Sequence, residues 1–273
     1  MNRKILEILI TGLEIVSSII SIIAFIKQDF TIFILMFISM AILSVLLFEI
    51  NKTKNQLKLV SLKVEDLNIT SLNIGNINRL TNHTLDFTEI EHTYTVRDGD
   101  LDILQRCKGK VCKPDFENEI MFSICGDSNM SVEKADMWGF DLINDHNRST
   151  KILPRIVEND GISKLVALPL LKPTELNQLF EAEFFSTIES CILSTKDYIS
   201  AVASCSENEN CKFSVNLIFE NKNPKYVTSY RIIKGVPKLQ CRLNVKILNN
   251  KYIYHDQIYL HKKDCFKIYI FEY

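Results

Sequence analysis

This sequence has little glycine, proline or tryptophan: its 273 residues include 8 Gly, 6 Pro and 1 Trp. So few glycines leave little material for a glycine-rich phosphate loop, and the HExxH and GxSxG motifs are also missing. The 5 histidines are scattered, so no Cys-His or Ser-His arrangement follows from their order. We therefore expect a protein that is not an enzyme, with no catalytic residue and no cofactor.

The chain also lacks a large net charge of either sign: 32 Lys+Arg oppose 33 Asp+Glu, which gives a formal net charge of -1. This balance excludes a general attraction to nucleic acid, and we expect no DNA or RNA duplex as a partner. The charges are nevertheless unevenly distributed. Residues 86–221 carry 13 Lys+Arg and 24 Asp+Glu, whereas residues 222–273 carry 11 and 3. The acidic region 86–221 is therefore followed by a basic C-terminal segment, residues 222–273.

Closely spaced metal ligands are missing as well. The chain has 8 cysteines, but the nearest candidates for a four-ligand site, Cys107 with Cys112 and Cys205 with Cys211, are spaced more widely than the knuckles that zinc favours. We expect no metal site, and thiols rather than disulfides in a cytoplasmic domain.

Two long apolar runs occupy the first fifty residues. Residues 5–26 and residues 30–48 are separated only by the polar residues 27–29. Each run can cross a hydrocarbon core as a helix, which takes about 20 residues. The sequence therefore predicts a two-helix transmembrane hairpin over residues 1–50, with the lipid bilayer as its partner.

Basic residues flank these runs on both outer sides. They are Arg3, Lys4, Lys52, Lys54, Lys58 and Lys63. The positive-inside rule then predicts a two-pass protein of the inner (plasma) membrane, with both the N-terminus and the C-terminal portion in the cytoplasm.

Polar residues recur along the first apolar run at four-then-three spacing, which places them on one stripe of a helix. They are Glu7, Thr11, Glu14, Ser18 and Ser21. An ionised carboxylate at the position of Glu14 would cost roughly 2.5 to 3.5 kcal/mol in a membrane, so it needs a partner. One interpretation is a self-associating seam or pore lining in a homo-oligomer. The other is close packing and hydrogen bonding within the hairpin.

Residues 51–85 show a five-residue period. From residue 57 the units are LKLVS, LKVED, LNITS, LNIGN and INRLT, with aliphatic residues at nearly every first and third position. This period resembles that of pentapeptide-repeat β-helices. A frayed amphipathic helix is the other interpretation, and the pattern leaves both open. We name residues 51–85 the pentad-repeat neck.

From residue 86 onward, short alternating or aliphatic runs are separated by turn signals such as Asp98-Gly99 and Asn249-Asn250. The expected strands are 89–96, 101–107, 119–125, 137–143, 151–157, 163–169, 178–188, 212–219, 226–233, 239–248, 251–260 and 265–273. No Gly/Ser/Pro-rich linker divides them. We therefore predict one antiparallel β-sandwich or barrel over residues 86–273, and, for the whole chain, a membrane α-helical hairpin joined to this all-β cytoplasmic domain.

The basic segment contains the candidate binding residues. Alternation in 239–248 predicts a core strand whose cations lie on the outer face and whose inner face holds Leu239, Cys241, Leu243, Val245 and Ile247. The candidates for ligand binding are Tyr230, Arg231, Lys238, Arg242 and Lys246. Aromatic planes beside cations suit a nucleotide or another anionic ligand. Contact with a lipid or protein partner, and neutralisation of the acidic strands, are the alternatives.

The order of these parts, a short start, two apolar helices with a tight turn and a β domain, is similar to that of bacterial two-transmembrane β-domain effectors of anti-phage nucleotide signalling. The resemblance implies a nucleotide bound by the β domain and membrane helices that oligomerise. We thus expect a membrane-anchored sensor or effector that recognises an anionic small ligand or a protein partner. A constitutive membrane-tethered scaffold for protein–protein interaction is the alternative, and a tethered hydrolase is a third.

Overall fold

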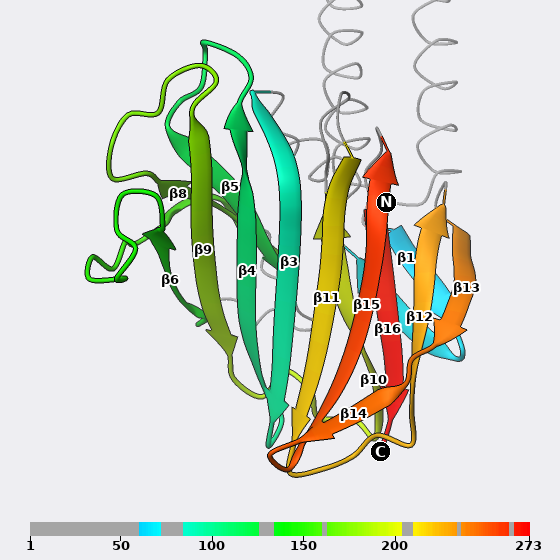
Figure 1. Cartoon of the computed structure of the whole chain (residues 1–273). Helices are drawn as coiled ribbons and strands as arrows, with labels where there is room; N and C mark the ends of the chain where they lie inside the picture. The colour runs from blue at the N-terminus through cyan, green and yellow to red at the C-terminus, as the bar shows by residue number, and fades with distance from the viewer. Residues whose placement is uncertain are drawn as a thin grey trace, which may run out of the picture. The chain divides into compact units, whose positions relative to one another are not determined.

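The chain divides by its internal contacts into two compact units, Met1–Leu57 and Lys58–Tyr273. The computed structural model describes only parts of the second unit (Figure 1): residues 60–71, 84–125, 134–159, 163–203, 210–233, 236–261 and 265–273.

The predicted fold class, a membrane helical hairpin joined to a β domain, is wrong. The residues that the structure describes are all-β, and none of them forms a helix long and apolar enough to cross a membrane. The prediction relied on the length of two apolar runs in the sequence. Residues 1–50, with the predicted seam residues Glu7, Glu14, Ser18 and Ser21, lie outside the described residues.

The described strands are β1 (Val60–Val64), β2 (Leu67–Ser71), β3 (Leu85–Arg97), β4 (Asp100–Val111), β5 (Glu119–Cys125), β6 (Asp136–Asp141), β7 (Arg155–Asn159), β8 (Ser163–Pro169), β9 (Leu179–Ile188), β10 (Lys196–Ala203), β11 (Asn210–Glu220), β12 (Tyr226–Ile233), β13 (Val236–Arg242), β14 (Val245–Leu248), β15 (Lys251–His261) and β16 (Cys265–Glu272).

The largest sheet has seven strands in the order β14-β15-β11-β3-β4-β9-β6 (Figure 1). Its neighbours are antiparallel except β11 and β3, which run parallel with Lys212 opposite Glu89. Strand alternation defines its inner face: in β4, Leu101, Ile103, Gln105 and Cys107 are buried, and the residues that alternate with them are partly exposed.

Two smaller sheets cover this inner face. The three-stranded sheet β5-β8-β7 contributes Phe122, which stacks on Phe184 of β9 at 5.1 Å. The four-stranded sheet β10-β16-β12-β13 contributes Phe271, whose ring meets the ring of Phe219 in β11 at 5.0 Å. All four side chains belong to one hydrophobic cluster. The predicted sandwich is therefore consistent in part, because sheets pack face to face, but the β3–β11 pair is parallel and two separate sheets form the cover.

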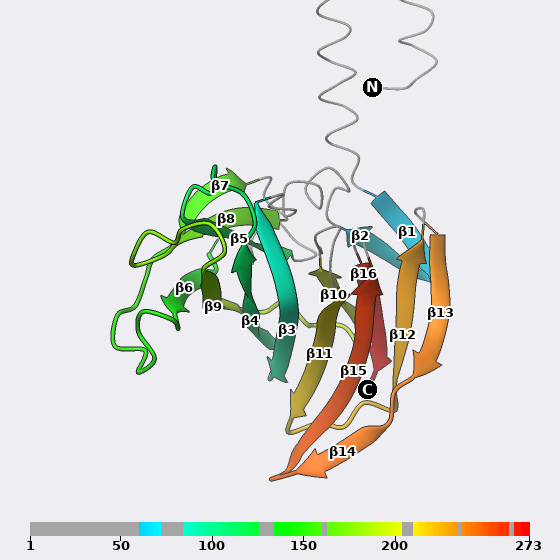
Figure 2. The same cartoon turned by 45° about the horizontal axis from the view of Figure 1, so that its top comes forward.

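A β-hairpin made of β1 and β2 packs on the other face of the four-stranded sheet (Figure 2). Its turn residues Glu65 and Asp66 have φ values of 48° and 69°, as expected of a two-residue hairpin turn. Val64 lies in a second hydrophobic cluster with Tyr198 and Tyr230. Residues 60–71 of the predicted neck thus form a hairpin and no helix, whereas residues 72–83 lie outside the described residues.

The hairpin explains why β16 is buried along almost its whole length. One face of this strand, with Tyr269 and Phe271, meets the seven-stranded sheet, and the other, with Ile268 and Ile270, meets the hairpin side. A strand buried on both faces needs apolar residues at successive positions, as the run in 265–273 provides.

Two predicted hairpin turns are confirmed. Asp98 and Gly99, with φ values of 51° and 96°, join β3 to β4. Asn249 and Asn250, with φ values of 50° and 60°, join β14 to β15. Asn, Asp and Gly are the residues that adopt positive φ at the lowest cost, which is why the sequence signal was reliable.

Candidate partner-binding edge

Residues 236–248, which we call the edge segment, pass from one sheet to another. Its first part is β13, at the end of the four-stranded sheet, and its second part is β14, at the end of the seven-stranded sheet. The chain changes sheets at Leu243 and Asn244, between the two strands. The predicted single strand 239–248 is therefore two short strands.

The prediction that this segment is a core strand is wrong. Leu239 and Ile247, assigned to the inner face, are each 63% exposed, and Val245 is 42% exposed. Only Leu243 packs against the core, and it is partly buried. Alternation predicts which residues share a face, but it cannot show whether another layer covers that face.

Both strands of the edge segment have a free side in the part of the chain that the structure describes. β13 pairs only with β12, and β14 pairs only with β15. An edge strand presents unpaired backbone N–H and C=O groups that can pair with another chain. Pro237 and the bulge opposite Ser229 and Tyr230 interrupt this row of groups but do not remove it.

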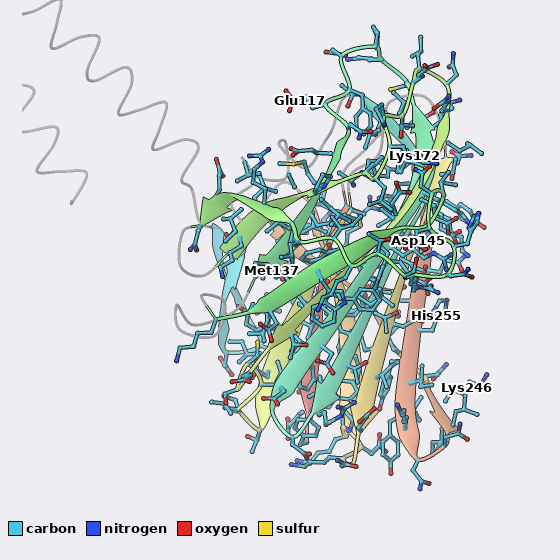
Figure 3. The ribbon with its side chains drawn as sticks, turned by 90° about the vertical axis from the view of Figure 1, so that its left-hand side faces the viewer. Glu117, Met137, Asp145, Lys172, Lys246 and His255 are labelled. Carbon is cyan, nitrogen blue, oxygen red and sulfur yellow. The ribbon has the colours of Figure 1, made fainter. Side chains whose placement is uncertain are left out.

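The edge segment contains three cations and no carboxylate. Lys238 and Lys246 are exposed, and neither makes an ion pair with any described residue. Lys246 projects away from β14 (Figure 3). Arg242 is held in place, because its Nη2 donates to the Lys225 carbonyl at 2.7 Å and its guanidinium lies over the Tyr226 ring at 5.5 Å. The segment is therefore positively charged as well as apolar.

The structure does not bring all five predicted ligand-binding residues together. Lys238 and Arg242 lie on β13, whereas Lys246 lies on a different sheet. Tyr230 is buried, and its hydroxyl donates to the Glu65 carboxylate of the hairpin. Arg231 pairs in register with Lys238 and with Lys267, and it is partly buried. The predicted cluster is thus divided between an exposed edge and a buried layer.

Behind this edge, between β12, β15 and β16, lies a buried ionic cluster that the sequence reasoning missed. Lys267 donates to Oδ2 of Asp256, and the same oxygen accepts hydrogen bonds from Ser229 Oγ and Tyr269 Oη, both at 3.0 Å. The side chains of Lys267 and Asp256 are 3% and 11% exposed. A lysine inside the apolar run 265–273 was the one available signal.

The cluster fixes the charge of its members. Burial alone would raise the pKa of Asp256, but the hydrogen bond and charge of Lys267 outweigh it and hold that pKa below its ordinary value. Burial, together with the charge of Asp256, raises the pKa of Tyr269 well above its ordinary value. Asp256 is therefore ionised and Tyr269 neutral at physiological pH, so the cluster is a satisfied structural element.

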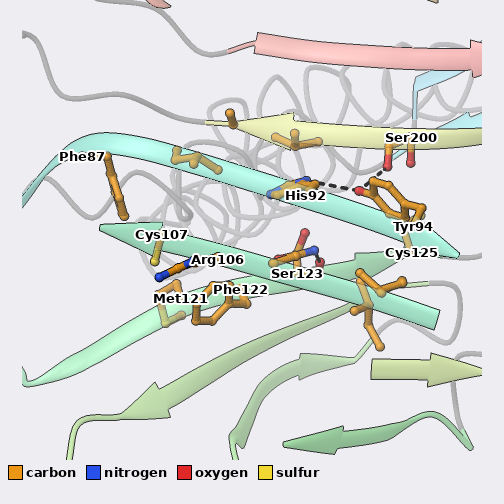
Figure 4. A pocket seen from close by; sticks show the side chains of 16 residues that line it. Phe87, His92, Tyr94, Arg106, Cys107, Met121, Phe122, Ser123, Cys125 and Ser200 are labelled. Carbon is orange, nitrogen blue, oxygen red and sulfur yellow. Dashed lines mark hydrogen bonds between the residues drawn. The ribbon is translucent and has the colours of Figure 1, made fainter. Parts of the chain in front are cut away.

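A second polar site lies where the two covering sheets meet the seven-stranded sheet. It is a cavity of about 60 Å³ lined by His92, Tyr94, Gln105 and Ser200 among others (Figure 4). Tyr94 donates its hydroxyl proton to the Ser200 carbonyl at 2.9 Å, so His92 Nδ1, at 3.2 Å from that hydroxyl, carries the proton that it donates to Tyr94. Burial lowers the pKa of His92 to about 3.

This cavity is too small for the nucleotide that the sequence suggested. A water needs about 10–15 Å³ of such volume, so the cavity accommodates a few waters, whereas ligand pockets usually exceed about 300 Å³. In the described ranges no three His, Cys, Asp or Glu side chains are grouped as a metal site would require. The edge segment is therefore the strongest candidate for a functional surface.

No protein-family model and no curated protein matches this chain. Among solved structures, an M1 zinc metallopeptidase from Deinococcus radiodurans is similar at a TM-score of 0.38 and 12% identity, over 68% of this chain and 42% of that chain. Yeast LTA4 hydrolase is similar at a TM-score of 0.35 and 9% identity, over 70% of this chain and 29% of that chain. The chain thus spans less than half the length of these proteins, and likenesses this distant assign neither a fold family nor an activity.

Proposed function

We propose that this chain is a non-catalytic recognition protein whose β domain binds an acidic, extended segment of a partner protein along the edge segment, residues 236–248. The observation that carries the proposal is the combination of two free strand edges, three cations without a carboxylate, and exposed aliphatic side chains in one continuous stretch. Residues 1–50 lie outside the described residues, so the proposal concerns recognition by the β domain alone.

Edge strands often carry lysine and proline only to prevent aggregation. Lys238, Lys246 and Pro237 fit that role, but the exposed aliphatic residues of the same segment do not. Val236, Leu239 and Leu248 are 56%, 63% and 51% exposed. A purely protective edge would place polar side chains there, so these residues favour an edge that is covered in a complex.

The charge of the edge segment favours an acidic partner over a second copy of this chain. Two copies paired along this edge would place like charges opposite each other, which destabilises a strand pair. An added strand gains main-chain hydrogen bonds, and alternate side chains determine its specificity. A strand that alternates aliphatic and acidic residues would match both the exposed aliphatics and the cations. Self-association, which the sequence predicts, therefore needs a different surface.

Binding of a synthetic decapeptide of alternating valine and glutamate to the full-length chain tests this proposal. We expect the double variant Lys238→Gln/Lys246→Gln to bind roughly three- to tenfold more weakly, as expected for two exposed charge pairs. The difference between variant and parent should shrink in high salt, because salt screens exposed charges. Isothermal titration calorimetry at two salt concentrations measures both effects.

The matched control is Lys113→Gln/Lys172→Gln, which removes the same charge at two exposed lysines outside the edge segment. This control should bind the peptide as the unsubstituted chain does. Equal weakening in both double variants would mean that only net charge matters. That outcome, or a peptide that does not bind the unsubstituted chain at all, contradicts recognition by the edge.

A further inference from the structure

A groove of about 330 Å³ lies at the end of the molecule where the β3–β4 turn, the β9–β10 connection and the β11–β12 connection meet. Its lining includes Leu193, Asp98, Glu220, Lys222 and Tyr273. This volume is within the range of small-ligand pockets, which begins at about 300 Å³. The groove involves no residue of the edge segment.

The aromatic wall of the groove is firmly held. The Tyr273 ring packs edge-on against Phe219 at 6.0 Å and against Phe271 at 5.7 Å. The Tyr273 backbone N–H donates to the Thr195 carbonyl at 2.9 Å. Burial raises the pKa of Tyr273 to about 12, so the ring is neutral at physiological pH.

A cation from the chain itself already occupies the face of this ring. Lys222 Nζ lies 4.4 Å from the Tyr273 ring centroid. Lys222 makes no ion pair with any described residue, so the ring is the partner of its ammonium in the described structure. An ammonium over a neutral aromatic face is stabilised by the ring quadrupole. The position of Lys222 therefore shows that the face of the Tyr273 ring can hold an ammonium group.

The two carboxylates of the groove differ in availability. Glu220 is neutralised by Arg97 and Lys251, each at 2.6 Å, and the hydrogen bond of Arg97 lowers the pKa of Glu220 to about 2. Asp98 accepts a side-chain hydrogen bond from the amide of Asn221 at 3.4 Å, and it acts on the nearby Arg97 only through its charge. Asp98 can thus accept a hydrogen bond from a cationic ligand without breaking an ion pair.

The remaining wall is apolar. Leu193 is 75% exposed, and Ile192 and Val96 beside it are buried parts of the core. An exposed leucine in a groove offers contact area to an alkyl chain. The aromatic face of Tyr273, the available carboxylate of Asp98 and the exposed side chain of Leu193 together match an ammonium group at the end of an alkyl chain.

We propose that this groove binds a primary alkylammonium group. The bound ammonium replaces that of Lys222 on the Tyr273 ring and donates to the Asp98 carboxylate, and its alkyl chain lies along Leu193. The ligand is a free alkylamine or the lysine side chain of another protein, because both present the same group. Lys222 acts as an internal competitor that occupies the ring when no ligand is bound.

Titration of the full-length chain with n-hexylammonium chloride, followed by saturation-transfer NMR on the ligand, tests this site. We expect Lys222→Gln to strengthen binding roughly two- to fivefold, because the competing cation is removed from the ring. The matched control is Lys225→Gln, which removes the same charge from the same connection but not from the ring, since Lys225 pairs with Glu272 at 2.8 Å. Lys225→Gln should strengthen binding less.

Two substitutions of the ring complete the test. Tyr273→Phe retains the aromatic face and should leave hexylammonium binding within twofold, whereas Tyr273→Leu should weaken it several-fold. n-Hexanol, which lacks the charge, should not bind. N-acetyl-lysine methylamide separates the two sources: affinity equal to that of hexylammonium favours a partner's lysine, and a clear preference for hexylammonium favours a free amine.

Equal effects of Lys222→Gln and Lys225→Gln would overturn the proposal, and so would binding of n-hexanol as tight as that of hexylammonium. Both lysines are exposed, so these variants report on the groove even if Tyr273→Leu lowers the stability of the fold.

Discussion

Replacing Asp256 with alanine is expected to lower the free energy of unfolding by about 3–5 kcal/mol, the usual cost of removing one partner from a buried ion pair. The substitution leaves the Lys267 ammonium, 3% exposed, without its carboxylate. It also removes the acceptor of the Ser229 and Tyr269 hydroxyls. Urea unfolding of the full-length chain at pH 7, followed by circular dichroism, measures the loss.

Two further variants show whether the loss comes from the unpaired charge. Asp256→Asn preserves the side-chain size, and we expect it to retain most of the destabilisation. The triple variant Asp256→Leu/Lys267→Met/Tyr269→Phe removes the charges and the phenol together, and it should recover to within about 2 kcal/mol of the parent, since apolar replacements of buried pairs are well tolerated. A loss below about 1 kcal/mol for Asp256→Ala would contradict the buried pair.

Stability is expected to fall by roughly 2 kcal/mol between pH 7 and pH 5 because of His92. Burial lowers the pKa of this imidazole from 6.5 to about 3 in the folded protein. Below pH 6.5 the unfolded chain therefore binds a proton that the folded chain does not. The contribution is fully present above pH 6.5 and is lost progressively as the pH falls toward 3.

The window between pH 7 and pH 5 isolates this effect, because the carboxylates with lowered pKa values, such as Glu220 and Asp256, affect stability only at lower pH. His92→Gln retains a donor for Tyr94 and removes the titrating group. Urea midpoints at pH 7, 6 and 5 should decline for the parent and stay nearly level for the variant. Parallel declines in the two proteins would show that His92 is not the cause.

Most strands and two turns of residues 84–273 could be predicted because their determinants are local, although β10 was not among the expected strands. Asp98-Gly99 and Asn249-Asn250 adopt the positive φ values that two-residue hairpins need. Strand β4 buries alternate residues, and its sequence follows this alternation at Leu101 and Ile103. Local propensity and hydrophobic pattern agree in these elements, so the sequence was sufficient to predict them.

The three cations of the candidate site were predicted, but its exposed position at two sheet edges was not, because exposure depends on distant parts of the chain. Leu239 and Ile247 have the pattern of core residues, yet the sheet order leaves both at an uncovered edge. Tyr230 has the pattern of an exposed aromatic, yet Val64 and Glu65, more than 160 residues earlier, cover it. The parallel pairing of β3 with β11, which are separated by seven strands in the sequence, is equally non-local.

The five-residue period did not predict the β1–β2 hairpin, for a related reason. Leu67 and Val64 occupy aliphatic positions of successive repeats, which suggested a solenoid or a helix face. In the structure they are directly paired across a two-residue turn. A hairpin of two five-residue strands and a five-residue repeat place aliphatics at the same sequence positions, and only the sheet beneath them distinguishes the two.

Amide hydrogen exchange of the full-length chain, with and without the decapeptide of alternating valine and glutamate, is the most direct test of edge recognition. Strand addition protects the backbone N–H groups that an edge strand leaves unpaired. We predict slower exchange in 236–248 on peptide binding and unchanged exchange in the opposite edge strands β10 and β6. Protection of β10 or β6 with none in 236–248 would contradict recognition by the edge segment.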